Sequence, residues 1–158
     1  MWGKKLVTAL KPILLVEDEP NDVEMTLLAL EQINLANQVL SLRDGAEALD
    51  FLYYRGKFAD RPHGLPAVLL LDNKMPKVDG LTVLRQIRSD EALRLLPVVM
   101  LTSSRMEQDV IASYELGINA YVVKPVGRES FVQAIQQLGL FWLIRNEPPP
   151  GATRFEKR

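Results

Sequence analysis

Five short apolar runs recur along the chain, each separated from the next by enough residues to form a helix. The runs are PILLVED (12–18), QVLSLR (38–43), AVLLLD (67–72), PVVMLTS (97–103) and AYVVKP (120–125). The segments between them carry apolar residues at helical spacing, such as Val23, Leu27 and Leu30 in the first. Strands that are apolar on both faces and alternate with helices indicate a parallel sheet covered on both sides. The predicted fold is therefore a doubly wound α/β domain around a five-stranded parallel sheet.

The length of the chain limits how many such sheets it can hold. With 158 residues, of which 47% are hydrophobic, the chain fits one globular domain with a substantial core. We expect a lead-in over 1–11, the domain with an extended last helix over 12–145, and a disordered tail over 146–158, where consecutive prolines stop a helix. The opening MWGKKLVTALKP fits neither a signal peptide nor a membrane span, so the expected location is the cytoplasm, away from membranes.

Residue counts exclude several functional classes. Lys and Arg (19) nearly balance Asp and Glu (20), so the chain has no large positive net charge that would favour nucleic acid as a partner. The absence of cysteine excludes disulfides and thiol chemistry, and a single histidine argues against histidine metal clusters and Ser-His-Asp catalysis. That histidine, His63, lies in the Gly- and Pro-containing loop 55–66, which is longer than most connections and is predicted to lie on the surface. We expect His63 to be exposed and assign it no role.

Polar residues stand at the ends of four of the five apolar runs. They are Glu17 and Asp18 after the first run, Asp72 after the third, Thr102 and Ser103 at the fourth, and Lys124 at the fifth. The carboxyl ends of parallel strands meet at one edge of the sheet, where ligands bind. Carboxylates that converge there repel one another, and oxygen ligands without His or Cys select a hard cation such as Mg²⁺. Lys124 and Thr102 would then face an anion, for which a phosphoryl group is the natural candidate.

Three functions could use such an acidic site. An aspartate-nucleophile phosphatase of the haloacid-dehalogenase type needs a second aspartate two positions after Asp72, where this chain has Lys74. A phosphoacceptor needs no such group, because its aspartyl phosphate is kept as a signal. A flavodoxin-like cofactor binder needs a phosphate-cradling loop rich in Gly, Ser and Thr, whereas EDEPNDV (17–23) is acidic. The residues favour a phosphoacceptor over an enzyme that acts on small substrates.

Each of these residues also has a purely structural interpretation. Asp72 alone would more often cap a helix, Thr102 could be an ordinary β-branched strand residue, and Tyr121 a core aromatic. The coincidence of Asp72 with Glu17, Asp18 and Lys124 at neighbouring strand ends favours a functional role. Asp44 and Asp79, each directly before a glycine, are instead predicted to be helix N-caps.

Four motifs occur in order along the chain: VEDEP (16–20), LLLDNKMPKVDG (69–80), MLTSS (100–104) and YVVKP (121–125). They resemble the receiver domain of two-component response regulators, from about residue 12 to residue 140. This resemblance implies the flavodoxin-like strand order 2-1-3-4-5, which is the order that a chemotaxis receiver has. It also implies that Asp72 is the phosphoacceptor and that Asp18, Asp72 and the Lys74 carbonyl hold Mg²⁺, with Glu17 assisting through water.

The resemblance further implies a switch and a partner. Thr102 and Lys124 would hold the phosphoryl oxygens, and Tyr121 would turn inward when the Thr102 hydroxyl moves toward the phosphate. The phosphoryl group would come from the phosphohistidine of a histidine kinase. A phosphate sink that only drains its kinase would carry the same residues, so the roles of messenger and sink both fit.

Two features narrow the resemblance. The loop 55–66 and the ending LGLFWL (138–143) are similar to small stand-alone regulators paired with phytochrome-type histidine kinases. In that group the residue two after the phosphoacceptor is commonly Asn, whereas this chain carries Lys74. The departure leaves the lifetime of the phosphoryl group open.

The last helix is predicted to be apolar on most sides. Phe131, Ile135, Leu138 and Trp142 follow a core-facing spacing, and Leu140, Phe141, Leu143 and Ile144 add apolar residues around the rest of the circumference. One face of a sheet cannot bury them all, so we expect a homodimer through this helix, with contributions from the fourth helix and the fifth strand. In the alternative, Gly139 ends the helix and the residues behind it turn inward.

Overall fold

Five parallel strands form one sheet in the order β2-β1-β3-β4-β5, so the predicted fold class and strand order are confirmed. The computed structural model describes residues 11–35 and 37–145. The strands are β1 (Ile13–Val16), β2 (Val39–Leu42), β3 (Val68–Leu71), β4 (Val98–Thr102) and β5 (Ala120–Val123). The helices are α2 (Pro20–Gln32), α3 (Gly45–Leu52), α4 (Gly80–Ser89), α5 (Glu107–Glu115) and α6 (Arg128–Leu140), with a short 3-10 helix η1 (Gly56–Phe58) and a π-helical turn η2 (Phe141–Arg145).

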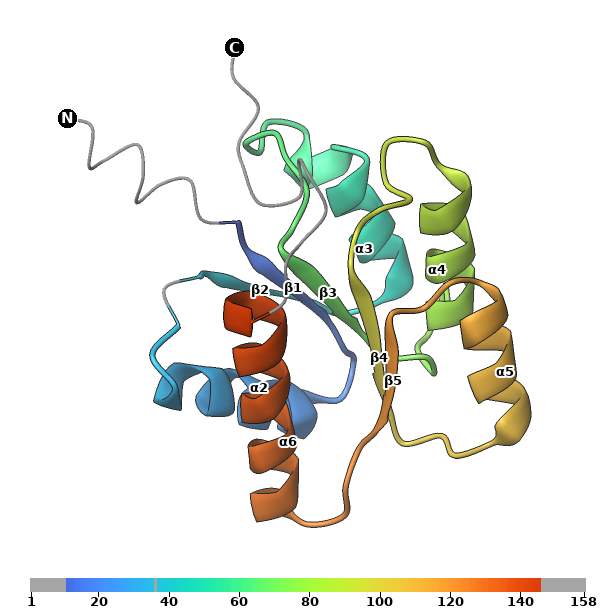
Figure 1. Ribbon diagram of the computed structural model, residues 1–158. Helices are drawn as coiled ribbons and strands as arrows, with labels where there is room; N and C mark the ends of the chain where they lie inside the picture. The colour runs from blue at the N-terminus through green and yellow to red at the C-terminus, as the bar shows by residue number, and fades with distance from the viewer. Residues whose placement is uncertain (1–10, 36, 146–158) are drawn as a thin grey trace, which may run out of the picture.

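Helices cover the sheet on both faces. Figure 1 shows α2 and α6 against one face, and α3, α4 and α5 against the other. The central strands β1, β3 and β4 are buried along their whole length, as expected for strands packed on both sides, whereas the edge strands β2 and β5 are partly exposed. Each face has its own apolar core: one includes Leu14, Leu69 and Met100, and the other Leu15, Leu70 and Val99. Successive residues of each strand thus serve opposite cores.

Two helices begin at the aspartates predicted to cap them. The Asp44 side chain accepts a hydrogen bond from the Glu47 N–H at 2.8 Å, and that of Asp79 accepts one from Thr82 at 2.9 Å. Gly80 then begins α4 directly against the loop after β3, since a Cβ at this position would collide with the Asp72 carbonyl oxygen. The start of α4 therefore holds the carboxyl end of β3 in place.

The loop 55–66 lies on the surface, as predicted, and it is tightly organised around Arg61. The guanidinium carbon of Arg61 lies 3.9 Å from the ring centroids of both Phe51 and Tyr54, and its Nε donates to the Phe51 carbonyl at 2.7 Å. His63 is exposed, as expected, and stacks on Tyr54 with the two ring centroids 4.8 Å apart. The loop joins α3 to the amino end of β3, on the opposite edge of the sheet from Asp72.

Helix α6 does not end at Gly139, so the alternative interpretation of this glycine is wrong. The helix continues to Leu140. Gly139 is buried, and a Cβ at this position would press on the side chains of Leu30, Ile33 and Leu35. Glycine thus allows α6 to approach α2 closely. The apolar residues behind it divide between two environments: Leu140 and Phe141 are exposed, whereas Trp142 and Leu143 pack partly against the core.

The predicted tail over 146–158 and residues 1–10 of the predicted lead-in lie outside the described residues. The domain boundaries at 11 and 145 therefore stay predictions. Within the described part of the chain, no helix is long and apolar enough to span a membrane.

Candidate functional site

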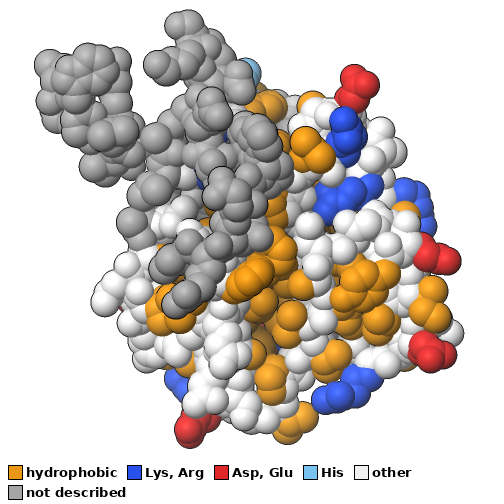
Figure 2. Space-filling model, viewed as in Figure 1, with side chains coloured by type: hydrophobic (Ala, Val, Ile, Leu, Met, Phe, Trp, Pro, Cys, Tyr) orange, Lys and Arg blue, Asp and Glu red, His pale blue; other side chains and the backbone are white. Residues whose placement is uncertain are grey.

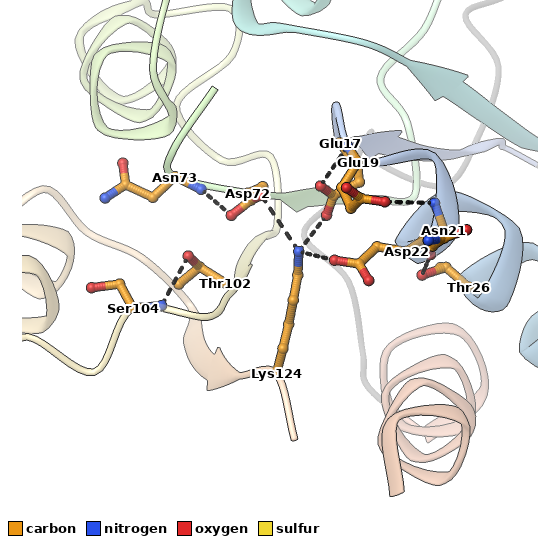
Figure 3. Close-up of polar contacts among 10 residues, drawn as sticks. All are labelled: Glu17, Glu19, Asn21, Asp22, Thr26, Asp72, Asn73, Thr102, Ser104 and Lys124. Carbon is orange, nitrogen blue, oxygen red and sulfur yellow. Dashed lines mark hydrogen bonds and ion pairs between the residues drawn. The ribbon is translucent and has the colours of Figure 1, made fainter. Parts of the chain in front are cut away.

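The carboxyl ends of β1, β3, β4 and β5 meet at one edge of the sheet, where the polar residues of Figure 3 gather. Asp72 follows β3 directly, and its N–H donates to the Val16 carbonyl at 3.0 Å. Glu17 follows β1 in the same way, with its N–H on the Leu42 carbonyl at 3.0 Å. Sheet pairing therefore extends one residue beyond these strands, and it fixes two buried carboxylates at the edge of the sheet.

Glu17, Asp18 and Asp72 form a cluster of three carboxylates. One oxygen atom from each lies within 4.8 Å of the others. Glu17 and Asp72 are buried, and Asp18 is exposed. Like charges this close repel one another strongly where water is partly excluded. The three acidic residues predicted for this edge are therefore together, and they need positive charge.

Lys124 supplies part of that charge from the end of β5. Its Nζ lies 2.6 Å from Glu17, 2.7 Å from Asp22 and 3.4 Å from Asp72, so it bridges three carboxylates (Figure 3). Sequence reasoning missed Asp22, which lies in the first turn of α2. Its signal was its position four residues after Asp18, one helical turn along a segment that starts at the site.

The ionisation of the site reflects this arrangement. Burial raises the pKa of Glu17 to about 7, and the nearby charge of Asp72 acts in the same direction, although the bond from Lys124 opposes both. Burial alone would lower the pKa of Lys124, but its hydrogen bonds to Asp22 and Glu17 outweigh that effect and raise it. Lys124 is thus a permanent cation, whereas Glu17 is only partly ionised near neutral pH, and another cation would favour its charged form.

Thr102 and Tyr121 are both linked to Ser104, in the loop after β4. The Thr102 side chain is fully buried, and its Oγ1 accepts a hydrogen bond from the Ser104 N–H at 3.3 Å. The half-buried Tyr121 donates its hydroxyl to the Ser104 carbonyl at 3.1 Å. The Ser104 hydroxyl in turn donates to Asp109 of α5 at 2.6 Å. Ser104, which sequence reasoning did not single out, therefore connects the end of β4 to Tyr121 and to α5.

The loop behind Asp72 is held by Asn73, which was also missed. The Asn73 N–H donates to Asp72 Oδ1 at 2.7 Å, and its own side-chain oxygen accepts from the Leu81 N–H at 3.2 Å. Asn73 is buried, whereas the side chain of Lys74 is exposed. Asp72 thus has one oxygen bound by its own loop and the other directed toward Lys124.

The charges and donor atoms of the site fit a divalent cation. Among the described residues, Lys124 pairs with the carboxylates of Glu17, Asp22 and Asp72, and Asp18 adds a fourth carboxylate beside Glu17 and Asp72. All the available ligands are oxygen atoms, which suit Mg²⁺ or Mn²⁺ better than they suit zinc or copper. The same edge offers a carboxylate as a nucleophile, a fixed lysine and a buried hydroxyl, the groups that phosphoryl transfer to an aspartate uses.

Comparison with known proteins defines the class. The response regulator receiver domain family matches residues 13–136. The chain therefore belongs to the receiver domain family of two-component signalling proteins. Family membership and the missing second aspartate at Lys74 both speak against the phosphatase interpretation.

Its relatives include regulators of phytochrome systems. Response regulator Rcp1 from Synechocystis is 39% identical over 133 residues, covering 84% of this chain and 89% of the relative. The crystal structure of the Mn²⁺-bound form of Rcp1 has a TM-score of 0.83 at 38% identity, covering 88% of this chain and 99% of that one. The phosphorylated cyanobacterial phytochrome response regulator RcpA also has a TM-score of 0.83, at 36% identity, with 89% and 99% covered. The bacteriophytochrome response regulator RtBRR is 62% identical with a TM-score of 0.72, with 90% and 86% covered.

Proposed function

We propose that this receiver domain accepts a phosphoryl group on Asp72 from the phosphohistidine of a histidine kinase. The observation that carries the proposal is the position of Asp72: a buried carboxylate at the end of β3, clustered with Glu17 and Asp18 and within 3.4 Å of Lys124. A carboxylate that only capped a helix would have no reason to share its site with this many like charges.

In the proposed reaction, an oxygen of Asp72 forms a bond to phosphorus while the P–N bond of the phosphohistidine breaks. The electron pair of that bond leaves with the imidazole nitrogen. Lys124 would pair with one phosphoryl oxygen, and the Thr102 hydroxyl would donate to another. The protein then needs no general acid of its own, which agrees with Lys74 standing two positions after Asp72.

The site would hold Mg²⁺ through the carboxylates of Asp18 and Asp72 and the carbonyl of Lys74, with Glu17 assisting through water. The unbalanced carboxylates support this assignment, as does the Mn²⁺-bound form of the relative Rcp1. When bound, the ion supplies charge that offsets the repulsion among carboxylates and phosphoryl oxygens. The ion would then take over part of the charge pairing of Glu17, and Lys124 could turn toward the phosphoryl group.

The output would be a switch that runs through Ser104. A Thr102 hydroxyl that turns toward a phosphoryl oxygen loses its bond from the Ser104 N–H, now 3.3 Å long. The loop after β4 then shifts, and the Ser104 carbonyl no longer holds the hydroxyl of Tyr121. Tyr121 would turn inward, and α5, tied to Ser104 through Asp109, would move with the loop.

The proposed kinase is of the phytochrome type and meets the regulator in the cytoplasm. The support is the similarity to RcpA and RtBRR, whose names link them to phytochromes. A recess of about 350 Å³ beside Lys124, lined in part by Asp22, Met25 and Pro125, opens next to the site. Val126 at its rim is 94% exposed, so this side offers an apolar surface to an approaching helix. Either a messenger or a phosphate sink would use this surface.

Phosphorylation of Asp72 can be tested with a small phosphodonor and Mg²⁺. Intact-protein mass spectrometry should show one added phosphoryl group on the parent chain and none on Asp72→Asn. Asp60→Asn is the matched control, because it makes the same change in the exposed loop 55–66, and it should be phosphorylated like the parent. Sustained turnover of phosphomonoesters, or equal phosphorylation of Asp72→Asn, would overturn the proposal.

We also propose that the domain forms a two-fold dimer through the face made by α5, β5 and α6. Figure 2 shows hydrophobic side chains gathered on the side of the molecule that carries these elements. Phe141 is 51% exposed, Leu140 40% and Ile111 of α5 51%. A patch of this kind used by both copies closes after two subunits. The face adjoins α5, so the switch could alter the dimer.

Sedimentation velocity tests the dimer. The parent chain should sediment as a dimer at tens of micromolar, on the order of the range expected for a modest interface. Leu140→Lys combined with Phe141→Lys should give a folded monomer that is still phosphorylated, because both side chains are already exposed and neither belongs to the carboxylate cluster. A monomeric parent, or a double variant that stays dimeric, would contradict the proposal.

A further inference from the structure

An apolar groove lies between α2 and the edge strand β2, away from the carboxylate site. It has a volume of about 360 Å³ and is lined by Leu27, Leu30, Glu31, Leu35, Asn37 and Val39. Leu27, Leu35 and Val39 are only partly buried, although they are apolar. We call this surface the α2–β2 groove. It lies on the face of the sheet that α2 and α6 cover, beside the edge strand.

The chain enters the fold at the rim of this groove. The Asn37 side chain, which lines the groove, donates to the Lys11 carbonyl at 2.7 Å. Two residues on, the Ile13 N–H donates to the Gln38 carbonyl at 2.8 Å. Residue 11 is therefore fixed next to the groove. The ten residues that precede it in this chain can extend about 33 Å, enough to cover a groove that begins beside their last residue.

The sequence of these ten residues matches the groove in pattern and charge. Trp2, Leu6 and Leu10 are spaced four residues apart, so they would lie on one face of a helical segment. Lys4 and Lys5 fall between them, on other faces. An apolar stripe flanked by ammonium groups complements a groove that is apolar except for the carboxylate of Glu31 and the amide of Asn37.

We propose that residues 1–10 dock in the α2–β2 groove of their own chain, with the stripe Trp2, Leu6 and Leu10 against Leu27, Leu35 and Val39. Lys4 or Lys5 would pair with Glu31 at the rim. Docking there would brace α2 next to its contact with α6, because Leu30 lines the groove and also faces Gly139 of α6. Since α2 carries Asp22, the partner of Lys124, the segment stabilises an element of the phosphorylation site from a distance.

Two other occupants are conceivable, and the chain itself argues against both. The segment 146–158 is the first of these, but Phe155 is its only aromatic residue and it has no apolar stripe. A second copy would have to offer an apolar surface of its own, and the exposed residues Ile111, Leu140 and Phe141 already belong to the dimer face proposed above. The segment fixed at the rim has the shortest path to the groove.

The two tryptophans of the chain, Trp2 and Trp142, make the proposal testable in the intact protein. In a Trp142→Phe background, Trp2 is the only tryptophan. Its emission should lie at shorter wavelength than that of a free tryptophan derivative, and acrylamide should quench it several-fold less. Leu27→Lys should return both readouts to the free values. Leu28→Lys, the same change at the adjacent half-buried position that does not line the groove, should leave them unchanged.

Variants in the segment keep the test decisive if Leu27→Lys unfolds, as far-UV circular dichroism would show. Leu6→Lys changes no residue of the described core and should expose Trp2 as Leu27→Lys does, whereas Thr8→Lys should not. A fully exposed Trp2 in the Trp142→Phe protein without further substitutions would overturn the proposal. So would protection that disappears on dilution, which would mean a second copy, or loss of thermal stability in Phe155→Lys alone, which would mean that the tail occupies the groove.

Discussion

Charged side chains are paired differently at the two ends of the parallel strands. We call the end at which the strands finish the carboxyl edge of the sheet and the end at which they begin the amino edge. At the carboxyl edge, Glu17, Asp22 and Asp72 share the ammonium group of Lys124, and Asp18 adds a further carboxylate beside Glu17 and Asp72. At the amino edge, Arg61 has its guanidinium between two aromatic rings and in hydrogen bonds with backbone carbonyls. Carboxylates outnumber the cation at the first edge, whereas the cation at the second has aromatic rings and carbonyl oxygens as partners.

The difference reflects what each edge does. The amino edge has to close a twelve-residue loop over the start of β3, and Arg61 does this with one planar group that stacks and donates at the same time. The carboxyl edge receives an anion and a cation in the function proposed above, and satisfying every charge in advance would remove the driving force for binding them. We therefore expect substitutions at the two edges to have opposite effects on the free energy of unfolding.

The largest effect is expected at the amino edge. Arg61→Ala removes the hydrogen bonds to Phe51, Pro62 and Gly64 and both ring contacts, so the free energy of unfolding should fall by about 3 kcal/mol. Urea unfolding measures this. Arg55→Ala is the control: its ion pair with Asp50 is exposed, and its loss should cost under about 0.5 kcal/mol. Equal costs for the two variants would show that Arg61 does not organise the loop.

A smaller effect is expected from titration at the carboxyl edge. Burial raises the pKa of Glu17 from 4.5 to about 7, so between these values the folded state binds more protons than the unfolded state. Without Mg²⁺, the contribution of Glu17 to the free energy of unfolding should therefore be fully present below about pH 4.5. It should be lost as the pH rises through about 7. We expect a loss of roughly 2 kcal/mol, after allowance for screening.

Glu17→Gln isolates this contribution. The amide keeps an oxygen for Lys124 but cannot ionise, so the decline between about pH 4.5 and 7 should flatten when unfolding is followed in the presence of a chelator. Saturating Mg²⁺ should flatten the decline of the parent as well, because a cation favours the charged form of Glu17. A decline that persists in Glu17→Gln would assign it to other groups.

Much of this contrast between the edges could be predicted from sequence, because the point where an apolar run stops marks the end of a strand. Glu17, Asp72 and Lys124 each follow an apolar run directly, so parallel pairing alone brings them to one edge. The caps Asp44 and Asp79 were predictable for the same local reason. Information within a few residues is enough where the backbone geometry is regular.

The missed residues depend on contacts that are distant in sequence or on irregular backbone. Asp22 reads as an ordinary acidic residue in the first turn of a helix, and only the tertiary fold brings it to Lys124, which is 102 residues away in the sequence. Arg61 reaches two aromatic rings because Tyr54 adopts a positive φ of 57°, which no local pattern signals. Gly139 reads as a helix stop, but its role is close packing against α2.

The smallest effect, and the one of opposite sign, is expected at Asp18. This carboxylate is exposed, so removing its charge relieves only a screened repulsion with Glu17 and Asp72. Asp18→Asn should raise the free energy of unfolding in a chelator by under about 1 kcal/mol, while weakening Mg²⁺ binding and slowing phosphorylation. Asp60→Asn makes the same change at the amino edge and should alter neither quantity. Urea unfolding and Mg²⁺ titration measure the two effects on the same samples.

An Asp18→Asn variant that binds Mg²⁺ as tightly as the parent would place the ion elsewhere. A variant that loses stability would show that the carboxyl edge, like the amino edge, is already balanced.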